Sequence, residues 1–135
     1  MGVIIDTNIV VFWEKDPSRV LYYIQGKEEE EFFISVISAS ELLHGIYRAA
    51  NPIINARRKA FVEGILTQFP ILSIDLLTAR THAQLWANMQ ATGQMIGLHD
   101  SWIAAQCIAR GYSLVTHNIR EFQQVPGLVV EQWTR

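Results

Sequence analysis

Four acidic residues that lie far apart in the sequence have the types and positions needed to form one metal site. Asp6 directly follows an apolar run, and Glu41 is expected in the first turn of the helix after the second such run. Asp100 opens a later helix, and Glu121 follows the fourth run. Converging carboxylates repel one another and take up protons unless a cation neutralises them. Mg²⁺ or Mn²⁺ prefers such oxygen ligands, and the chemistry they would support is phosphodiester hydrolysis.

Each of these acids also has a purely structural explanation. Asp6 and Asp100 could cap helices, because aspartate accepts hydrogen bonds from the first backbone N–H groups. Ser38-x-x-Glu41 matches a capping box, and Glu121 could be an ordinary surface acid. Capping accounts for the residue types but not for their recurrence at one end of a sheet. Considered together, the four residues therefore favour the metal site.

The elements that must position these acids follow from the apolar patterning. Short β-prone runs predict five strands, at residues 3–5, 32–36, 71–74, 113–116 and 128–130. Helical spacing and cap signals predict helices at residues 7–14, 17–25, 38–47, 52–69, 76–92 and 99–110. In the helix at 76–92, an apolar stripe is expected to face the core or a second copy of the chain: Leu76, Ala83, Trp86 and Met89. The alternation predicts an α/β fold with a mainly parallel sheet.

Length and composition are those of one globular domain spanning residues 1–135. Half of the residues are apolar and 18% are charged, which excludes a disordered chain. The net charge of −2 neither requires nor excludes a nucleic-acid partner, because only the local distribution of charge matters to a phosphate backbone. Cys107 is the only cysteine, and no apolar run approaches the length of a membrane span. We therefore expect a cytoplasmic protein without a membrane partner.

Other chemistries fit the sequence less well. The four histidines form no His-x-x-x-His pair, and no cysteine pattern accompanies them, so a structural zinc site is not expected. His99 and His117 flank suspected site positions, although structural or solvent-facing roles suit them better. A phosphatase of the haloacid-dehalogenase type would need a second Asp where this chain has Asn8. It would also need a downstream lysine, and the last lysine here is Lys59.

Four ordered segments resemble the motifs of a known family. They are residues 3–8 (VIIDTN), 34–45 (ISVISASELLHG), 97–105 (GLHDSWIAA) and 114–122 (LVTHNIREF), with VPGL at 125–128. Together they resemble PIN-domain proteins, and most closely the VapC toxins of bacterial toxin–antitoxin modules. The resemblance covers nearly the whole chain. It implies a three-layer α/β/α sandwich and an endoribonuclease that depends on Mg²⁺ or Mn²⁺ and uses a metal-activated water.

The resemblance also implies roles for individual residues. It makes Asp6, Glu41 and Asp100 the metal-coordinating acids. Thr7 and Asn8 match the motif's hydroxyl and amide, which orient Asp6 or hold water. Many PIN domains have an acid at the position of Asn118, so Glu121 is assigned the fourth acidic role. Two residues are expected to support that corner of the site: Thr116 and Asn118.

The partners implied by the resemblance are an RNA substrate, a VapB-like antitoxin that blocks the site, and a second copy of the chain. Four basic residues are candidates to follow the RNA backbone, or else to form solvated helix faces: Arg48, Arg57, Arg58 and Lys59. The alternative from another class is a catalytically inactive PIN-like module that only binds RNA or protein. Retention of the three main acids argues against that alternative, but the sequence does not show that they converge.

Overall fold

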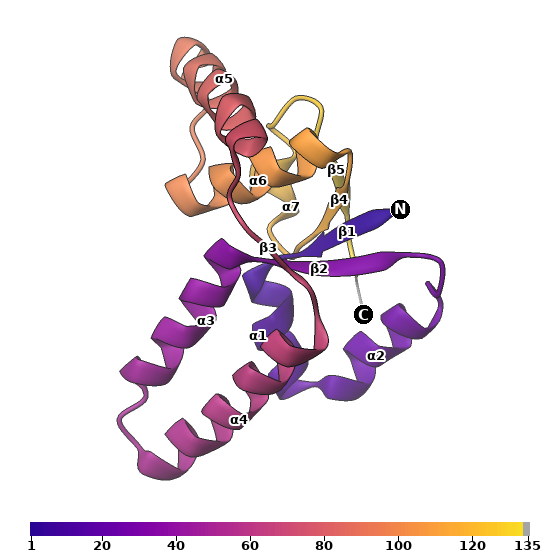
Figure 1. Cartoon of the computed structure of the whole chain (residues 1–135), viewed down its shortest axis with the longest axis vertical. Coiled ribbons are helices and arrows are strands. Elements are labelled where there is room, and N and C mark those ends of the chain that lie inside the picture. Colours follow the sequence, from indigo (N-terminus) through magenta and orange to yellow (C-terminus); the bar gives the residue numbers. More distant parts are fainter. Residues whose placement is uncertain (134–135) are drawn as a thin grey trace.

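The computed structural model describes residues 1–133 and contains one five-stranded sheet. The strands are β1 (Gly2–Ile5), β2 (Glu31–Ser35), β3 (Ile71–Leu72), β4 (Ser113–Val115) and β5 (Val129–Glu131). The helices are α1 (Thr7–Lys15), α2 (Pro17–Gln25), α3 (Val36–Arg48), α4 (Pro52–Gln68), α5 (Leu76–Thr92), α6 (Leu98–Arg110) and α7 (Ile119–Phe122). The strand order is β3-β2-β1-β4-β5, and every neighbouring pair is parallel. The predicted α/β class is confirmed (Figure 1).

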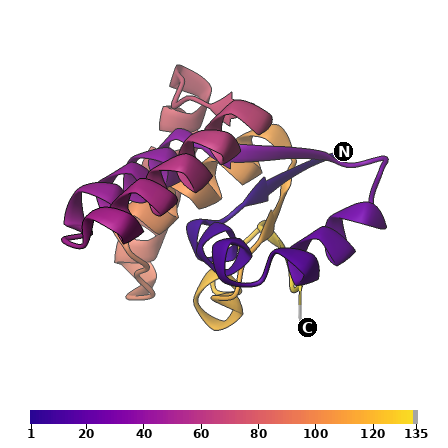
Figure 2. The same ribbon diagram turned by 90° about the horizontal axis from the view of Figure 1, so that it is seen from below.

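The sheet separates two layers of helices, which makes the fold a three-layer α/β/α sandwich. Helices α1–α4 lie on one side of the sheet and α5–α7 on the other (Figures 1 and 2). The central strand β1 shows how the sequence specifies this. Val3 and Ile5 belong to the core shared with α1–α4, and Ile4 belongs to the core shared with α5–α7. Successive residues of a strand point to opposite faces, and a strand between two helical layers is apolar on both.

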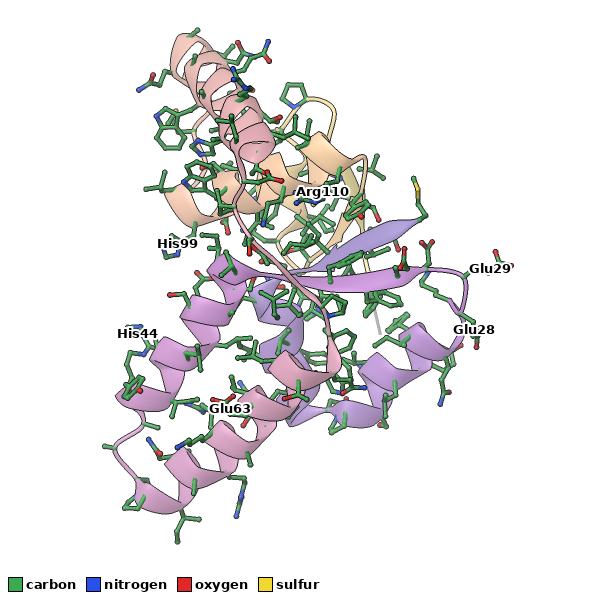
Figure 3. The ribbon with its side chains drawn as sticks, viewed as in Figure 1. Glu28, Glu29, His44, Glu63, His99 and Arg110 are labelled. Carbon is green, nitrogen blue, oxygen red and sulfur yellow. The ribbon has the colours of Figure 1, made fainter. Side chains whose placement is uncertain are left out.

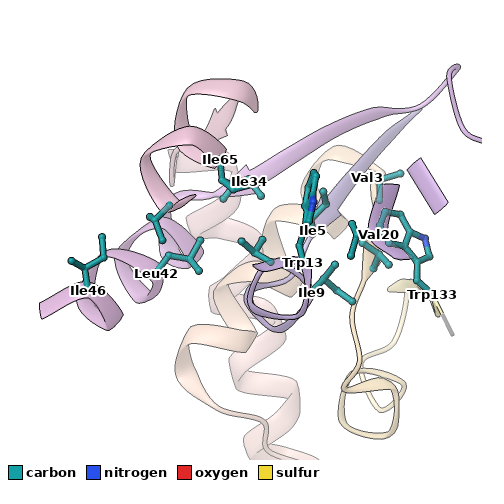
Figure 4. Close-up of a cluster of buried hydrophobic side chains, with 13 residues drawn as sticks. Val3, Ile5, Ile9, Trp13, Val20, Ile34, Leu42, Ile46, Ile65 and Trp133 are labelled. Atoms are coloured by element: carbon teal, nitrogen blue, oxygen red, sulfur yellow. The ribbon is translucent and has the colours of Figure 1, made fainter. Parts of the chain in front are cut away.

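The core on the α1–α4 side fixes the helices that carry part of the site. Trp13 of α1, Leu42 of α3 and Ile65 of α4 pack against it, as Figure 4 shows. All three side chains are at most 6% exposed. Burying a large apolar side chain stabilises the fold by about 1.5–3 kcal/mol. The starts of α1 and α3 are therefore held firmly at the edge of the sheet.

The carboxyl ends of the two central strands form the point where the strand order reverses. From β1 the chain proceeds outward through β2 to β3, and then crosses to β4 and β5 on the other side of β1. In open α/β sheets, ligands bind in the crevice outside the strand ends at such a point. Asp6 immediately follows β1 and Thr116 immediately follows β4.

Two helix starts differ from the sequence-based prediction, and both differences remove a structural explanation for a site acid. Helix α3 begins at Val36, because Ser35 Oγ accepts a hydrogen bond from the Ile37 N–H at 3.1 Å. Val36 is β-branched and suits a strand equally well, which is why the predicted strand ran too far. Glu41 consequently lies in the second turn, so its role in a capping box is wrong. Gly97 occupies the N-cap position of α6, so Asp100 is not a cap either.

Smaller differences concern short or ambiguous segments. The four-residue helix α7 was not predicted, and β3 has only two of its four expected residues. Of the stripe predicted for α5, Met89 is buried in the core, whereas Leu76 is 67% exposed, so the core accounts for only part of it. The buried residues of that helix are Thr78, His82, Leu85 and Met89. No helix within residues 1–133 is both long and apolar enough to cross a bilayer.

Candidate active site

Asp6 joins the carboxyl ends of the two central strands and also caps α1. Its backbone N–H donates to the Val115 carbonyl at 3.0 Å, which continues the pairing of β1 with β4. One carboxylate oxygen accepts from the Thr7 N–H at 2.8 Å, and the other accepts from Thr116 Oγ1 at 2.7 Å. The residue is only 4% exposed. Asp6 therefore caps α1 and lies in the crevice at the same time.

Burial is the main cause that raises the pKa of Asp6 above its ordinary value. The hydrogen bonds from Thr116 and Thr7 act in the opposite direction, because they favour the charged form. The negative charges of Glu41 and Glu121 raise the pKa of Asp6 again. Acids from three separate segments of the chain are thus close enough to repel one another.

Glu41 is held at this edge by contacts from α1 and α6. The Thr7 hydroxyl donates to Glu41 Oε1 at 2.5 Å, and that hydroxyl also lies 2.8 Å from the Ser38 hydroxyl. The second oxygen, Oε2, lies 3.1 Å from Nδ1 of His99. Ser38 is fully buried, so the start of α3 is fixed against the start of α1. These contacts aim Glu41 toward the crevice.

Asp100 lies in the first turn of α6, close enough to the other acids for their negative charges to shift its pKa. Its pKa is raised to about 6 by burial first, and then by repulsion from Asp6, Glu121 and Glu41. His99 partly offsets these effects. Perturbed carboxylates of this kind cluster at functional sites.

Glu121 projects from the short helix α7 toward the same group. Its Oε2 accepts a hydrogen bond from the Asn118 side-chain amide at 2.8 Å, and Oε1 lies 3.4 Å from the Gly97 backbone N–H. Its charge raises the pKa of both Asp6 and Asp100. The structure therefore brings Glu121 to the other three acids, with Asn118 beside it.

A polar network behind the acids is centred on Thr116. The Asn8 amide donates to Thr116 Oγ1 at 3.3 Å, and the Asn118 backbone N–H donates to the same oxygen at 3.0 Å. Asn8 Oδ1 in turn accepts from the His117 N–H at 3.2 Å. The Thr116 hydroxyl thus donates its hydrogen bond to Asp6 and fixes where that carboxylate points. Asn8 reaches Asp6 only through Thr116, so any orienting effect is indirect.

A shallow pocket of about 370 Å³ opens over three of the four acids, and Glu121 is not among its lining residues. It is lined by Asp6, Thr7, Asn8, Val11, Glu41, Asp100 and Asn118. Within residues 1–133, no three acidic, histidine or cysteine side chains are arranged closely enough to form a complete ligand set. The all-oxygen donors and their mutual repulsion nevertheless fit a hard divalent cation, which keeps several water ligands of its own.

A second, larger groove of about 500 Å³ continues from this pocket between α1, α3 and α4. It shares Thr7, Val11 and Glu41 with the acidic pocket. Its floor is apolar, and its lining includes five basic or imidazole groups: Lys15, His44, Arg48, Arg58 and His99. Figure 3 shows His44 on α3 and His99 at the end of α6 nearest that helix.

Two of the four predicted RNA-contacting residues are not part of this groove. Arg48 and Arg58 line it, and Arg58 lies 3.8 Å from Glu14. Arg57 is exposed and is not among the lining residues, although it neighbours Arg58 on α4. Lys59 lines a separate small pocket, which also lies between α3 and α4. The difference arises because consecutive helical residues point about 100° apart.

Comparison with known proteins accounts for this arrangement of fold and acids. The PIN-domain family profile matches residues 3–128. The chain belongs to the PIN-domain family. It is 34% identical over 130 residues to the ribonuclease VapC1 of Rickettsia felis, covering 96% of this chain and 95% of that one. It is 30% identical to the tRNA(fMet)-specific endonuclease VapC of Salmonella typhimurium, covering 96% of each.

A solved structure places the PIN domain more narrowly among VapC proteins. VapBC2 of Rickettsia felis, bound to a DNA fragment from its promoter, superposes with a TM-score of 0.91 and 25% identity. The superposition covers 99% of this chain and 100% of that one. The predicted resemblance to the VapC group of PIN domains is therefore confirmed.

Sequence reasoning missed several contacts of this PIN-domain site. Ser38 was interpreted as a helix cap, yet it is buried against Thr7. The contact between His99 and Glu41 was not predicted, although His99 directly precedes Asp100 in the sequence. No local signal marks either contact, because each joins residues more than 30 positions apart.

Proposed function

We propose that this protein is a Mg²⁺- or Mn²⁺-dependent endoribonuclease and the toxin of a VapBC-type toxin–antitoxin system. The observation that carries the proposal is the gathering of Asp6, Glu41, Asp100 and Glu121 at the carboxyl ends of parallel strands. Burial first, and then repulsion from the other three acids, raises the pKa of Asp100 to about 6, and a bound cation would offset that repulsion. The relatives named as ribonucleases or endonucleases span nearly the full length of the chain.

The four acids would play two different roles at a bound cation. Asp6 and Asp100 would hold the principal ion, since both line the pocket and carry the raised pKa values. Glu41 and Glu121, each already engaged by a neighbour, would complete the site directly or through water. When bound, a divalent ion would lower the pKa of a water and offset negative charge on the phosphoryl oxygens during hydrolysis.

The surrounding side chains supply orientation. Thr116 donates a hydrogen bond to Asp6 and leaves other lone pairs of that carboxylate free for a cation. Thr7 does the same for Glu41, and Asn118 for Glu121. We assign Asn8 to holding Thr116 in place, because its amide donates to that hydroxyl. Fixed carboxylates avoid the cost of reorganisation when substrate binds.

The groove beside the acidic pocket suits the RNA backbone on one side of the scissile phosphate. Arg48 and Arg58 line this groove, which supports assigning them to the phosphates, whereas Arg57 is a neighbouring arginine outside the groove. Arg58→Ala is expected to weaken RNA binding several-fold and to reduce its salt dependence, while Arg57→Ala has a smaller effect. Filter binding with a cleavage-deficient Asp100→Asn background measures this. Equal losses in both variants would remove Arg58 from the RNA path.

The proposed partners follow from the family and its complexes. A VapB-like antitoxin is supported by the superposition on VapBC2. A homodimer is supported by apolar side chains exposed on α3, where Val36 is 37% and Tyr47 is 86% exposed. A single domain over residues 1–135 and a cytoplasmic location remain predictions from the sequence.

A second candidate function is an inactive PIN-like module that binds RNA or protein. The observation in its favour is that Glu41 already contacts both Thr7 and His99, which leaves it less free to meet a cation. Asp100 decides between the two candidates, because an RNA-binding module has no need of its charge.

The deciding experiment follows cleavage of structured RNAs with Mg²⁺, with Mn²⁺ and with EDTA, using wild type and Asp100→Asn. The endoribonuclease proposal expects cleavage by wild type that both chelation and the substitution abolish. RNA binding without cleavage under every condition would support the inactive module. Cleavage that survives chelation or the substitution would overturn the catalytic assignment.

A further inference from the structure

His82 and Ser101 form a buried polar pair between α5 and α6, next to Asp100. His82 Nε2 lies 2.8 Å from Ser101 Oγ, and the two residues are 8% and 0% exposed. The imidazole also stacks on Trp102, with ring centroids 3.7 Å apart and planes 4° from parallel. An apolar pair would fill this contact without the cost of burying polar groups. The pair does not reach the acidic pocket, so the proposed chemistry does not use it directly.

The direction of the hydrogen bonds can be worked out from the serine. The Ser101 hydroxyl donates to the Leu98 carbonyl at 2.7 Å. A hydroxyl has one proton, so the contact with His82 requires that His82 Nε2–H donates to Ser101 Oγ. The two bonds form a chain from α5, through Ser101, to the first residue of α6. Leu98 and Ser101 lie on either side of Asp100 within one helical turn.

Asp100 depends on this turn for its position. Within residues 1–133, no hydrogen bond holds its carboxylate, in contrast to those of Asp6, Glu41 and Glu121. The same three acids repel Asp100. Apart from the charge of His99, which partly offsets this repulsion, no side chain favours the position of the carboxylate, so its place depends on a fixed backbone.

We propose that His82, acting through Ser101, is a positioning residue that holds the first turn of α6 so that Asp100 faces the acidic pocket. This inference rests on the proposed metal-dependent function. The opposite end of α6 is held separately, because Arg110 Nη1 donates to Thr78 Oγ1 at 3.2 Å. Figure 3 shows Arg110 and His99 toward opposite ends of that helix.

The two ends of α6 provide matched variants. Ser101→Ala and His82→Leu remove the polar pair near Asp100. Thr78→Val removes a buried hydroxyl that joins the same two helices at the far end, and it serves as the control. His82→Gln keeps an amide donor at a similar reach but loses the ring that stacks on Trp102. Comparison of Gln with Leu therefore separates the hydrogen bond from the stacking.

The test measures Mn²⁺ affinity by calorimetry without RNA, and kcat and KM for RNA cleavage. Ser101→Ala and His82→Leu are expected to lower both Mn²⁺ affinity and kcat about tenfold with little change in KM, as loss of a residue that orients a metal ligand does. His82→Gln should recover most of the loss. Thr78→Val should lower the melting temperature but leave Mn²⁺ affinity and kcat near wild type.

Two results overturn the inference alone, provided that wild type binds Mn²⁺ and cleaves RNA. In the first, the Ser101→Ala variant has the same Mn²⁺ affinity and kcat as the Thr78→Val control. The other is His82→Gln that loses as much as His82→Leu, which would assign the effect to stacking. A wild-type protein that neither binds Mn²⁺ nor cleaves RNA would overturn both the proposed function and this inference.

Discussion

Asp6 and Asp75 both occupy the N-cap position of a helix but lie in opposite electrostatic surroundings. Asp6 caps α1 by accepting from the Thr7 N–H at 2.8 Å, and Asp75 caps α5 by accepting from the Thr78 N–H at 2.9 Å. Asp6 is buried among other acids, and its pKa is raised. Asp75 is exposed and lies 3.2 Å from Arg110, and hydrogen bonds from Thr78 together with that arginine lower its pKa.

This difference separates a cap that serves stability from the cap that is proposed to hold a cation. A carboxylate with a basic partner is satisfied within the fold. A buried carboxylate that faces Glu41 and Glu121 has its charge only partly offset by hydrogen bonds, and it gains from an added cation. Burial and the charged neighbours of an aspartate, rather than its capping bond, are therefore what distinguish these two residues.

The largest expected effect is on RNA cleavage, where exchanging each aspartate for asparagine tests the comparison directly. Asparagine caps helices about as well as aspartate, so both helices should persist. Asp6→Asn should lower kcat/KM about 100-fold or more, because it removes several kcal/mol of transition-state stabilisation. Asp75→Asn should stay within about twofold of wild type. Similar losses in the two variants would contradict the distinction between them.

Much of the fold could be predicted because it is determined by local signals. The β-branched run at residues 3–5 and the cap residues before α4 and α5 specify elements within a few positions. The failures occur where the local signal is divided or too short. Val36 and Ile37 suit a strand or a helix, and the four residues of α7 are too few to show a helical period.

For the site, residue types were predictable and contacts were not. Asp6, Glu41 and Asp100 were identified from position and resemblance, and the structure gathers them with Glu121 at one edge of the sheet. The contact of His99 with Glu41 and that of His82 with Ser101 depend on how helices cross. Helix crossing is set by the packing of many side chains, so no short motif records it.

A smaller effect is expected on stability without metal, where Asp100→Asn should stabilise the protein at pH 7.5. The pKa of Asp100 is about 6 in the folded protein and 3.8 when unperturbed, so the folded state binds the proton more tightly. The stability gained from that proton is fully present below pH 3.8 and is lost as the pH rises through 6. At pH 7.5 the neutral side chain should add about 1 kcal/mol to the free energy of unfolding, a value reduced because solvent screens a half-exposed group.

Urea unfolding in EDTA at several pH values measures this gain. The gain should shrink as the pH falls toward 4, where wild-type Asp100 is itself protonated in the folded state. Asp75→Asn should show the opposite sign at pH 7.5, because a carboxylate with a lowered pKa contributes stability above its unfolded value. A destabilised Asp100→Asn variant at pH 7.5 would show that burial and repulsion do not disfavour the charged form of Asp100 in the folded protein.

The smallest effect is expected from Arg110→Gln, which removes the basic partner of Asp75 and so tests whether charge alone separates the two caps. The pKa of Asp75 should rise toward its ordinary value, as followed by carboxyl NMR, and the melting temperature should fall slightly at neutral pH. The part of that difference that comes from Asp75 should disappear in acid, once Asp75 is protonated, whereas the part from the lost Arg110–Thr78 hydrogen bond should remain. The pKa should not exceed the ordinary value, because Asp75 stays exposed and no site acid contributes to its shift. A pKa raised as that of Asp6 is would mean that burial and neighbouring acids are not what set Asp6 apart.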